Sequence, residues 1–206
     1  MAQSPGRCDG SVQPTFRCPI SPRSILIIKK PQSEEALAFL TSIFGYFANR
    51  QLNVFVEECV FDECRNALVE DGNMNLDGHV GDDHSTNRLP KQSWLKKWDG
   101  CPSNIDLLIA LGGDGTLLHA ASLFPHETPP ILSFNFGSLG FLSPFSAKDF
   151  TSVMDNILAL HPIPVCYRHK LTCAVVHKST NITHTTHNLV ALNEVTVSRG
   201  MMHSMC

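Results

Sequence analysis

Short apolar runs alternate with amphipathic stretches through the first third of the chain. Residues 24–30 form a short apolar run that ends in two lysines. Such a run is typical of a strand buried on both faces of a parallel sheet. Residues 33–49 place their large apolar side chains on one helical face and two glutamates in the first turn, where the helix dipole favours them. A second strand is predicted over 52–56 and a second helix over 57–68. The order is therefore βαβα.

The same alternation resumes after residue 104. The pattern predicts a strand over 105–111, a helix over 116–123, a strand over 131–135 and a helix over 147–160. Apolar strands that alternate with helices are typical of a parallel sheet covered by helices. We therefore expect an α/β domain over residues 23–160, with a Rossmann-like parallel sheet.

The pattern changes to strand-rich sequence after residue 160. Two β-rich runs, 165–177 and 188–198, are separated by a polar, hairpin-like connection over 178–184. Neighbouring strands joined in this way form antiparallel sheet. Residues 161–206 are therefore expected to be the start of an all-β, sandwich-type domain.

Two segments lack this regularity. Residues 1–22 hold proline, glycine and polar residues without a sustained apolar run, and we expect a disordered tail. Residues 69–104 are acidic and polar, which predicts a flexible insertion. Near its end, Trp94 and Trp98 stand four residues apart beside several lysines. They either pack on the domain or form an interaction motif.

Composition and charge exclude several classes of protein. The chain has 206 residues, 43% hydrophobic and 17% charged, which is enough to bury a core. Its net charge of -3 gives no electrostatic footprint for nucleic acid. No apolar stretch approaches the roughly 20 residues that span a bilayer, so we expect no membrane association and a cytoplasmic location. The eight cysteines form no Cys-x-x-Cys pair and are expected to be free thiols rather than metal ligands.

The strongest chemical signal is Gly112-Gly113-Asp114-Gly115-Thr116, directly after the predicted strand over 105–111. Glycines let backbone N–H groups approach an anion closely, and the following helix points its positive end at the same place. Phosphate is the natural ligand. A carboxylate beside phosphate needs a separate role, as a base for a hydroxyl, a hydroxyl anchor or part of a magnesium site. The alternative is a tight turn with a helix-capping aspartate.

A second glycine-bearing loop follows the strand predicted over 131–135, with Gly137 and Gly140. Neighbouring parallel strands that both end in glycine loops indicate one shared ligand crevice. The alternative is a packed turn whose apolar side chains fill the core, and packing is favoured for those side chains. They are Leu139, Phe141 and Leu142.

An amide and a carboxylate interrupt the last apolar run. Asn193 and Glu194 lie between Leu192 and Val195, where burial without partners would cost a few kcal/mol. A base edge and a ribose hydroxyl would satisfy both side chains. The alternative is a strand end or bulge that leaves them in solvent.

Three motifs in this order resemble the NAD kinases that make NADP. They are 111–118 with the Gly-Gly-Asp-Gly-Thr turn, 137–142 with Gly-Ser-Leu-Gly-Phe-Leu, and 192–195 with Leu-Asn-Glu-Val. The first motif alone is shared with diacylglycerol and sphingosine kinases and, loosely, with phosphofructokinases. The other two make the resemblance specific to the NAD kinase family, and within that family the chain resembles the eukaryotic type.

The resemblance implies transfer of the ATP γ-phosphoryl group to the 2′-hydroxyl of the adenosine ribose of NAD, with a divalent metal, normally Mg²⁺. Asp114 matches the aspartate that binds or deprotonates that hydroxyl. The other matched positions imply contacts with the nucleotides. The first group lines the path of the phosphates, the second lies in the loop that closes on the dinucleotide, and the third is the pair that holds the dinucleotide. They are Gly112, Gly113, Gly115 and Thr116, then Gly137, Gly140 and Phe141, then Asn193 and Glu194.

Family members continue beyond the end of this sequence with further β structure. The resemblance therefore implies a truncated second domain here, and a homo-oligomer when that domain is complete. Two alternatives stay open: a lipid kinase of the same superfamily, and a non-catalytic, truncated nucleotide-binding protein.

Overall fold

The structure of the chain, a computed structural model, describes two compact units. The units are Met1–Val165 and Cys166–Cys206, and each is described by itself. Their division lies close to the predicted domain boundary at residue 160. The described residues are 15–16, 21–70, 94–137, 140–178 and 183–196.

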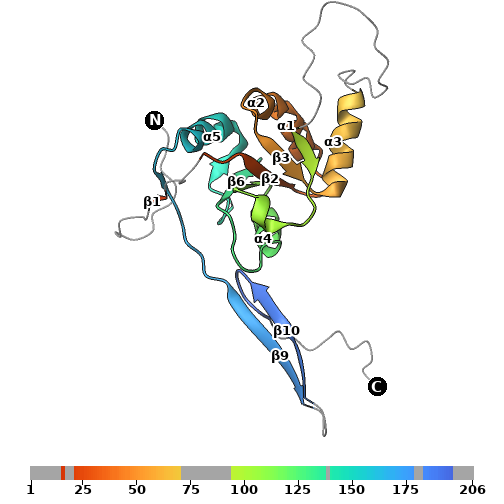
Figure 1. Ribbon diagram of the computed structural model, residues 1–206, viewed down its shortest axis with the longest axis vertical. Coiled ribbons are helices and arrows are strands. Elements are labelled where there is room, and N and C mark those ends of the chain that lie inside the picture. The colour runs from red at the N-terminus through yellow and green to blue at the C-terminus, as the bar shows by residue number, and fades with distance from the viewer. Residues whose placement is uncertain (1–14, 17–20, 71–93, 138–139, 179–182, 197–206) are drawn as a thin grey trace, which may run out of the picture. The chain divides into compact units, whose positions relative to one another are not determined.

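A six-stranded, fully parallel sheet forms the centre of the first unit, in the order β4-β3-β2-β5-β6-β7 (Figure 1). The chain runs outward from β2 through β3 to β4, then crosses back to add β5, β6 and β7 on the other side of β2. The direction of winding therefore reverses between β2 and β5. This confirms the predicted Rossmann-like α/β fold. The strands are β2 Ser24–Lys29, β3 Asn53–Val56, β4 Leu95–Lys97, β5 Leu107–Leu111, β6 Ile131–Asn135 and β7 Phe145–Ser146.

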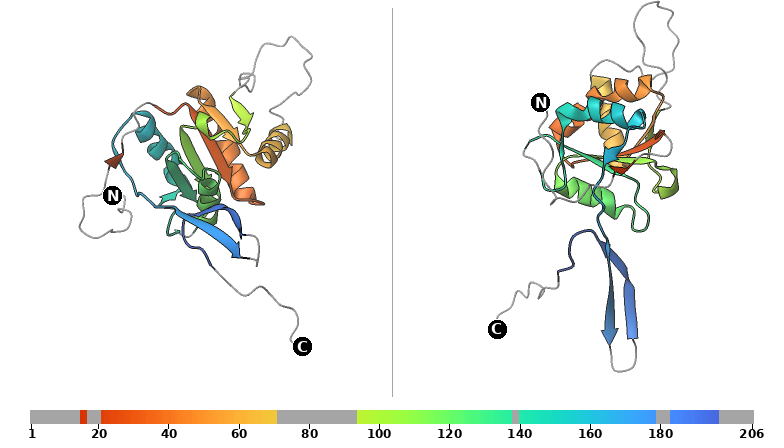
Figure 2. Two further views of the ribbon diagram at one scale, coloured as in Figure 1. Left: turned by 60° about the horizontal axis from the view of Figure 1, so that its bottom comes forward. Right: turned by 90° about the vertical axis from the view of Figure 1, so that its left-hand side faces the viewer.

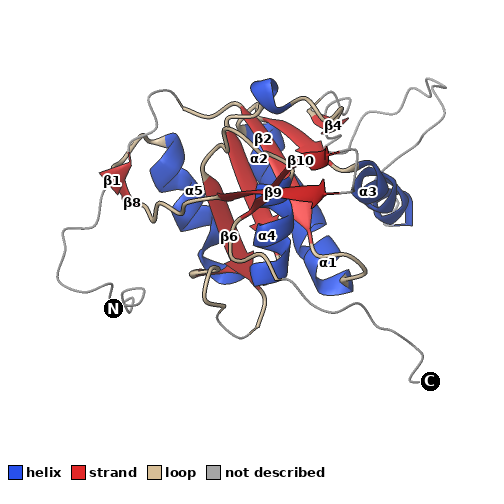
Figure 3. Ribbon diagram, turned by 90° about the horizontal axis from the view of Figure 1, so that it is seen from below, coloured by secondary structure: helices blue, strands red, loops and turns tan. Residues whose placement is uncertain are grey.

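Helices cover both faces of this sheet (Figure 2). Alternate residues of β2 face opposite sides: Ile25 and Ile27 join the core under α1, α2, α3 and α5, whereas Leu26 and Ile28 join the core under α4. Burial on both faces explains why the central strands read as continuous apolar runs. Figure 3 separates the strands and helices of these layers by colour. The helices are α1 Glu34–Ser42, α2 Phe44–Asn49, α3 Glu58–Glu70, α4 Asp114–Ser122 and α5 Phe150–Leu158, with short 3-10 turns at Pro102–Asn104 and Ala147–Asp149.

The helix predicted over 33–49 is two helices. Ser33 caps the first by accepting a hydrogen bond from the Ala36 N–H at 3.3 Å. The helix ends at Ser42. Ile43 caps it with a ψ of 2°, which is outside helical geometry, and α2 starts at the next residue. Because Ile43 is itself apolar and buried, the hydrophobic pattern continues across the break and does not reveal it.

The end of the predicted flexible insertion is ordered, so that part of the prediction is wrong. Residues 95–97 are strand β4, and Trp94 is buried edge-on against Phe44 with ring centroids 5.2 Å apart. Trp98 stacks on Phe124 at 5.7 Å, and its ring N–H donates to the Cys101 carbonyl. Both tryptophans therefore pack on the domain. Residues 71–93 of the predicted insertion lie outside the described part of the chain.

Part of the tail that was predicted to be disordered also forms a β-strand. Strand β1, Thr15–Phe16, lies antiparallel to β8, Ile163–Pro164. The other residues up to 20 lie outside the described ranges.

In the second unit, the described residues form an antiparallel hairpin of β9, Leu171–Lys178, and β10, Thr183–Ala191. Its register shifts between Thr186 and Leu189, which marks a β-bulge or irregularity. β10 begins and ends earlier than the strand predicted over 188–198.

The cysteines that the structure describes carry free thiols, as predicted. Burial raises the pKa of the Cys64 thiol to about 12, which keeps it protonated at neutral pH. Among the described helices, none is both long and apolar enough to cross a membrane.

Candidate functional site

The candidate site lies at the carboxyl edge of the sheet, where its winding reverses. Gly112 directly follows β5, and its N–H donates to the Phe134 carbonyl of β6 at 2.9 Å. On the other side, the Lys30 N–H after β2 donates to the Leu111 carbonyl at 2.9 Å. Open α/β sheets bind ligands beyond the carboxyl ends of their strands at this reversal.

Gly112 is required by the protein's own packing. Its φ is +154°, and a Cβ placed on it would overlap the Thr116 hydroxyl and lie 3.0 Å from the Lys30 Cβ. The turn can therefore fold back on α4 only with glycine at this position. Thr116 is buried within the first turn of α4, which begins at Asp114 rather than at the predicted Thr116.

The Asp114 carboxylate joins the two glycine-bearing loops. Its Oδ2 accepts a hydrogen bond from the Phe141 N–H at 2.9 Å, and its Oδ1 accepts one from the Leu142 N–H at 2.9 Å. The Ser143 hydroxyl also donates to Oδ1, at 3.3 Å. A Cβ on Gly140 would overlap this carboxylate, so the second loop approaches Asp114 closely because Gly140 has no side chain.

Gly113, Gly115 and Gly137 are different, because a Cβ placed on each meets no described atom within 4 Å. Gly113 is the N-cap of α4, and Gly115 lies in its first turn. The first N–H groups of a helix have no acceptor within the helix. The Thr116 N–H donates instead to the Gly113 carbonyl at 3.0 Å. The N–H groups of Asp114 and Gly115 are therefore the donors that this end of the helix presents beside open space, as an approaching anion requires.

Phe141 is fully exposed, at 100% of its accessible surface. The predicted packing of this side chain is therefore wrong. Its backbone N–H is held by Asp114, which leaves the ring in solvent. Leu142 is partly buried, and Leu139 lies outside the described residues.

A buried polar cluster behind Asp114 was not anticipated from the sequence. The Ser133 and Ser143 hydroxyl oxygens are 2.7 Å apart, and Asn135 Nδ2 donates to the Ser143 carbonyl at 3.0 Å. All three residues are at most 5% exposed. Two polar residues at alternate positions of an otherwise apolar strand were the available signal, since buried polar groups require partners.

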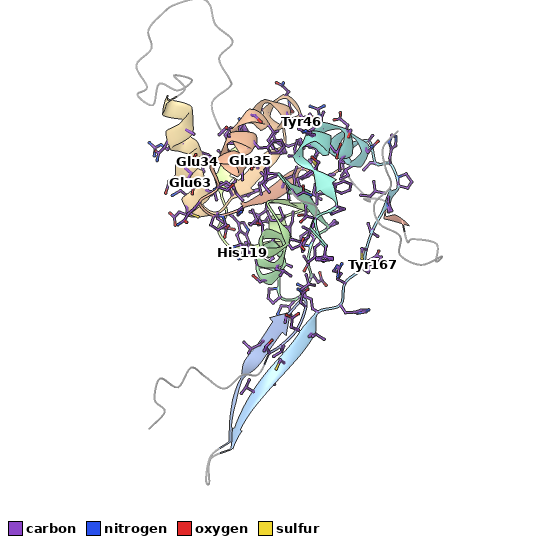
Figure 4. The ribbon with its side chains drawn as sticks, turned by 180° about the vertical axis from the view of Figure 1, so that it is seen from behind. Glu34, Glu35, Tyr46, Glu63, His119 and Tyr167 are labelled. Atoms are coloured by element: carbon purple, nitrogen blue, oxygen red, sulfur yellow. The ribbon has the colours of Figure 1, made fainter. Side chains whose placement is uncertain are left out.

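Two side-chain contacts also brace this edge of the sheet. Lys29, whose side chain is 1% exposed, forms an ion pair with Glu63 of α3 at 2.9 Å and donates to the Lys30 carbonyl. His119 of α4 lies 2.9 Å from a carboxylate oxygen of Glu57, beside the start of α3. Figure 4 labels Glu63 and His119 on these helices.

Residues 25–162 match the family described as ATP-NAD kinase N-terminal domain. The chain belongs to the NAD kinase family. It is 33% identical over 182 residues to a putative NAD kinase 3 of Oryza sativa, covering 87% of this chain and 34% of that protein. It is 30% identical over 183 residues to the mitochondrial NADH kinase POS5 of Saccharomyces cerevisiae, covering 86% of this chain and 40% of that protein.

The fold agrees with the family assignment. A crystal structure of yeast NADH kinase complexed with NADH matches with a TM-score of 0.63 and 26% identity, over 83% of this chain and 44% of that chain. The chain spans about a third of the length of the two Oryza sativa NAD kinases that it matches.

The remaining residues of the NAD kinase resemblance, Asn193 and Glu194, belong to the second unit. They follow the end of β10 and are exposed, rather than lying inside a strand as predicted. The strand ends at Ala191, which leaves both side chains in solvent. The residues that hold the Asp114 carboxylate, Phe141, Leu142 and Ser143, all belong to the first unit.

The described residues contain no group of three or more His, Cys, Asp or Glu side chains that could hold a metal ion. Mg²⁺ is commonly held by one or two carboxylates together with substrate phosphates.

Proposed function

We propose that this chain transfers the γ-phosphoryl group of ATP to the 2′-hydroxyl of the adenosine ribose of NAD, forming NADP. The observation that carries the proposal is the Asp114 carboxylate, held between two glycine loops at the sheet's reversal point. Such transfer depends mainly on positioning and charge stabilisation, with a carboxylate that orients the nucleophile. Membership of the family supplies the substrate class, and it disfavours the lipid kinase alternative.

In this proposal Asp114 acts on the acceptor hydroxyl. The carboxylate accepts a hydrogen bond from the ribose hydroxyl and takes its proton as the new bond to phosphorus forms. The Phe141 and Leu142 N–H groups keep the carboxylate in one orientation before the substrate arrives. Less reorientation is then needed at the moment of reaction.

Gly113 and Gly115 are assigned to phosphate binding. Gly113 and Gly115 leave room for phosphate oxygens to reach the first N–H groups of α4, whose positive end favours anions. Gly112 and the buried Thr116 hold this turn in shape. Mg²⁺ bound to the phosphates would neutralise charge on the transferred group.

The dinucleotide is assigned to the second loop. The exposed Phe141 ring offers a flat apolar surface to a base. A Cβ on Gly137, in the same loop, would meet no described atom within 4 Å. Gly140 contributes by letting this loop reach Asp114. Asn193 and Glu194 remain the proposed partners of the dinucleotide from the second unit.

The test is NADP formation by the 206-residue chain with Mg²⁺-ATP and NAD, repeated with NADH. Asp114→Asn keeps the shape of the side chain but removes its basic oxygen, and we expect turnover to fall by about a thousandfold or more. Asp149→Asn, at an exposed position far along the chain, is the matched control and should retain activity. Near-normal turnover by Asp114→Asn would exclude the proposed role.

Calorimetric titration with NAD and ATP separates the remaining alternative. Binding without turnover by the unvaried chain would indicate a non-catalytic nucleotide-binding protein. Phosphorylation of diacylglycerol in place of NAD would restore the lipid kinase hypothesis.

Location and assembly are further proposals. The sequence predicts a cytoplasmic protein, and relatives include proteins named mitochondrial and chloroplastic, so fractionation with a tagged chain is the deciding measurement. A homo-oligomer is expected for the family's full-length form, and sedimentation would measure it.

A further inference from the structure

The two oxygens of the Asp114 carboxylate are held unequally. Oδ1 accepts from the Leu142 N–H and the Ser143 hydroxyl, whereas Oδ2 accepts only from the Phe141 N–H among the described residues. Each carboxylate oxygen has two lone-pair positions for hydrogen bonds. Oδ1 is therefore fully used, and Oδ2 keeps one acceptor position.

This arrangement determines which hydroxyl donates in the hydrogen bond between Ser133 and Ser143. A carboxylate only accepts, so the single hydroxyl proton of Ser143 points at Asp114. The 2.7 Å contact between Ser133 and Ser143 must then have Ser133 as donor. Because Ser133 is 2% exposed, the hydroxyl chain ends inside the protein. The hydroxyl pair is therefore placed to orient the carboxylate.

Strand β6 fixes Ser143 at two points. Ser133 and Asn135 stand two residues apart and therefore face the same side of the strand. One donates to the Ser143 hydroxyl and the other to the Ser143 carbonyl. β6 pairs with β5, and β5 leads directly into the turn that carries Asp114. The carboxylate and the serine that holds it are thus both attached to neighbouring strands of one sheet.

We propose that Ser143 is a positioning residue that fixes Oδ1 of Asp114, so that Oδ2 is the oxygen that receives the acceptor proton. This inference rests on the proposed function. In the step, the O–H bond of the ribose 2′-hydroxyl breaks and its proton passes to Oδ2. The ribose oxygen bonds to the γ-phosphorus of ATP, and the bond from that phosphorus to the β–γ bridging oxygen breaks. The electron pair of the broken bond leaves with ADP.

The first test compares Ser143→Ala with Ser143→Thr. The alanine variant loses the donor to Oδ1, and we expect kcat to fall by on the order of 10- to 100-fold, as when a group that orients a reacting residue is lost. KM for NAD and ATP should change less than about threefold, because the backbone donors to phosphate remain. Threonine keeps the hydroxyl and should recover most of the loss. Ser152→Ala, at an exposed position in α5, is the control.

A second measurement reads the position of Asp114 without activity. Amide hydrogen exchange at Phe141 and Leu142 should quicken in Ser143→Ala and return toward the unvaried rate in Ser143→Thr. If Ser143→Ala does not fold, Ser133→Ala removes the supporting donor instead and should quicken exchange at the same amides.

The outcomes separate this inference from the proposed function. Unchanged exchange and unchanged kcat in Ser143→Ala would overturn the positioning role, as would equal losses in the alanine and threonine variants. If the unvaried chain forms no NADP, the proposed function fails. The exchange rates then decide alone whether Ser143 holds the carboxylate.

Discussion

Glycines of two kinds occur side by side in the loops after β5 and β6. Gly112 and Gly140 are packed, because a Cβ on either would overlap the hydroxyl or the carboxylate of a neighbouring residue. Gly113, Gly115 and Gly137 are open, with no described atom within 4 Å of the added carbon. One glycine-rich motif therefore serves two separate needs. The packed glycines let the chain fold closely on itself, and the open ones leave room for something else to approach.

The packed glycines act on the same residue from two directions. Gly112 lets the turn fold against Thr116 in the first turn of α4. This packing sets the position of Asp114, the first residue of that helix. Gly140 lets the second loop come close enough for the Phe141 N–H to reach the Asp114 carboxylate. The distinction between packed and open glycines thus predicts opposite consequences for substitutions of the same chemical size.

Among the glycine substitutions, the largest effect is expected for Gly140→Ala. The added methyl group must displace the Asp114 carboxylate, and a displacement of about 1 Å in a reacting group can cost roughly a hundredfold in rate. We expect kcat for NADP formation to fall by about that factor. The measurement is steady-state kinetics at saturating NAD and ATP.

Gly137→Ala is the matched control in the same loop. Its added carbon meets only open space, so kcat should change little, and any loss should appear in KM for the dinucleotide. Equal losses of kcat in both variants would remove the distinction between packed and open glycines in this loop.

The next largest effect is on stability, in Gly112→Ala. A side chain at φ +154° is strained and also overlaps the Thr116 hydroxyl, so the free energy of unfolding should fall by about 2 kcal/mol. Urea denaturation measures it. Gly113→Ala, with a φ of -85° and open space around it, should stay within about 0.5 kcal/mol of the unvaried chain. A similar loss of stability in both variants would contradict the packing argument.

The central strands could be predicted because burial on both faces demands unbroken apolar runs. The same signal failed at β4, where only Leu95 is buried and the two lysines that follow are exposed. A three-residue edge strand has too few buried positions to show a period. The break at Ile43 was hidden for the opposite reason, since a buried apolar residue occupies it.

At the site, the motif predicted Asp114 but not the residues that hold it. Hydrogen-bond partners far apart in sequence, such as Ser143 and Ser133, leave no periodic trace, and only their burial in three dimensions joins them. Phe141 was misjudged because an apolar residue beside leucines normally packs. Its backbone is instead held by Asp114 while its ring points into solvent.

Phe141→Ala tests what the open side of the second loop receives. A fully exposed ring contributes little to folding, so stability should be unchanged. Stacking of an aromatic ring on a base contributes roughly 1–3 kcal/mol, and KM for NAD should rise about tenfold. Phe141→Tyr keeps the flat ring and should restore it. An unchanged KM in the alanine variant would mean that the ring does not contact the dinucleotide.

The smallest effect is expected for Gly115→Ala. This substitution should raise stability while it weakens ATP binding. Gly115 lies in the first turn of α4 with open space around it. Because alanine has a higher helix propensity than glycine, the free energy of unfolding should rise by about 0.5 kcal/mol. The same methyl group would stand where a phosphate oxygen approaches. Losing one net hydrogen bond of about 1 kcal/mol should weaken ATP binding about fivefold, measured by calorimetric titration. A packed glycine cannot give this pair of opposite changes, because its substitution harms folding first. Unchanged ATP affinity in a stabilised Gly115→Ala would show that the space beside α4 is open for another reason than phosphate binding.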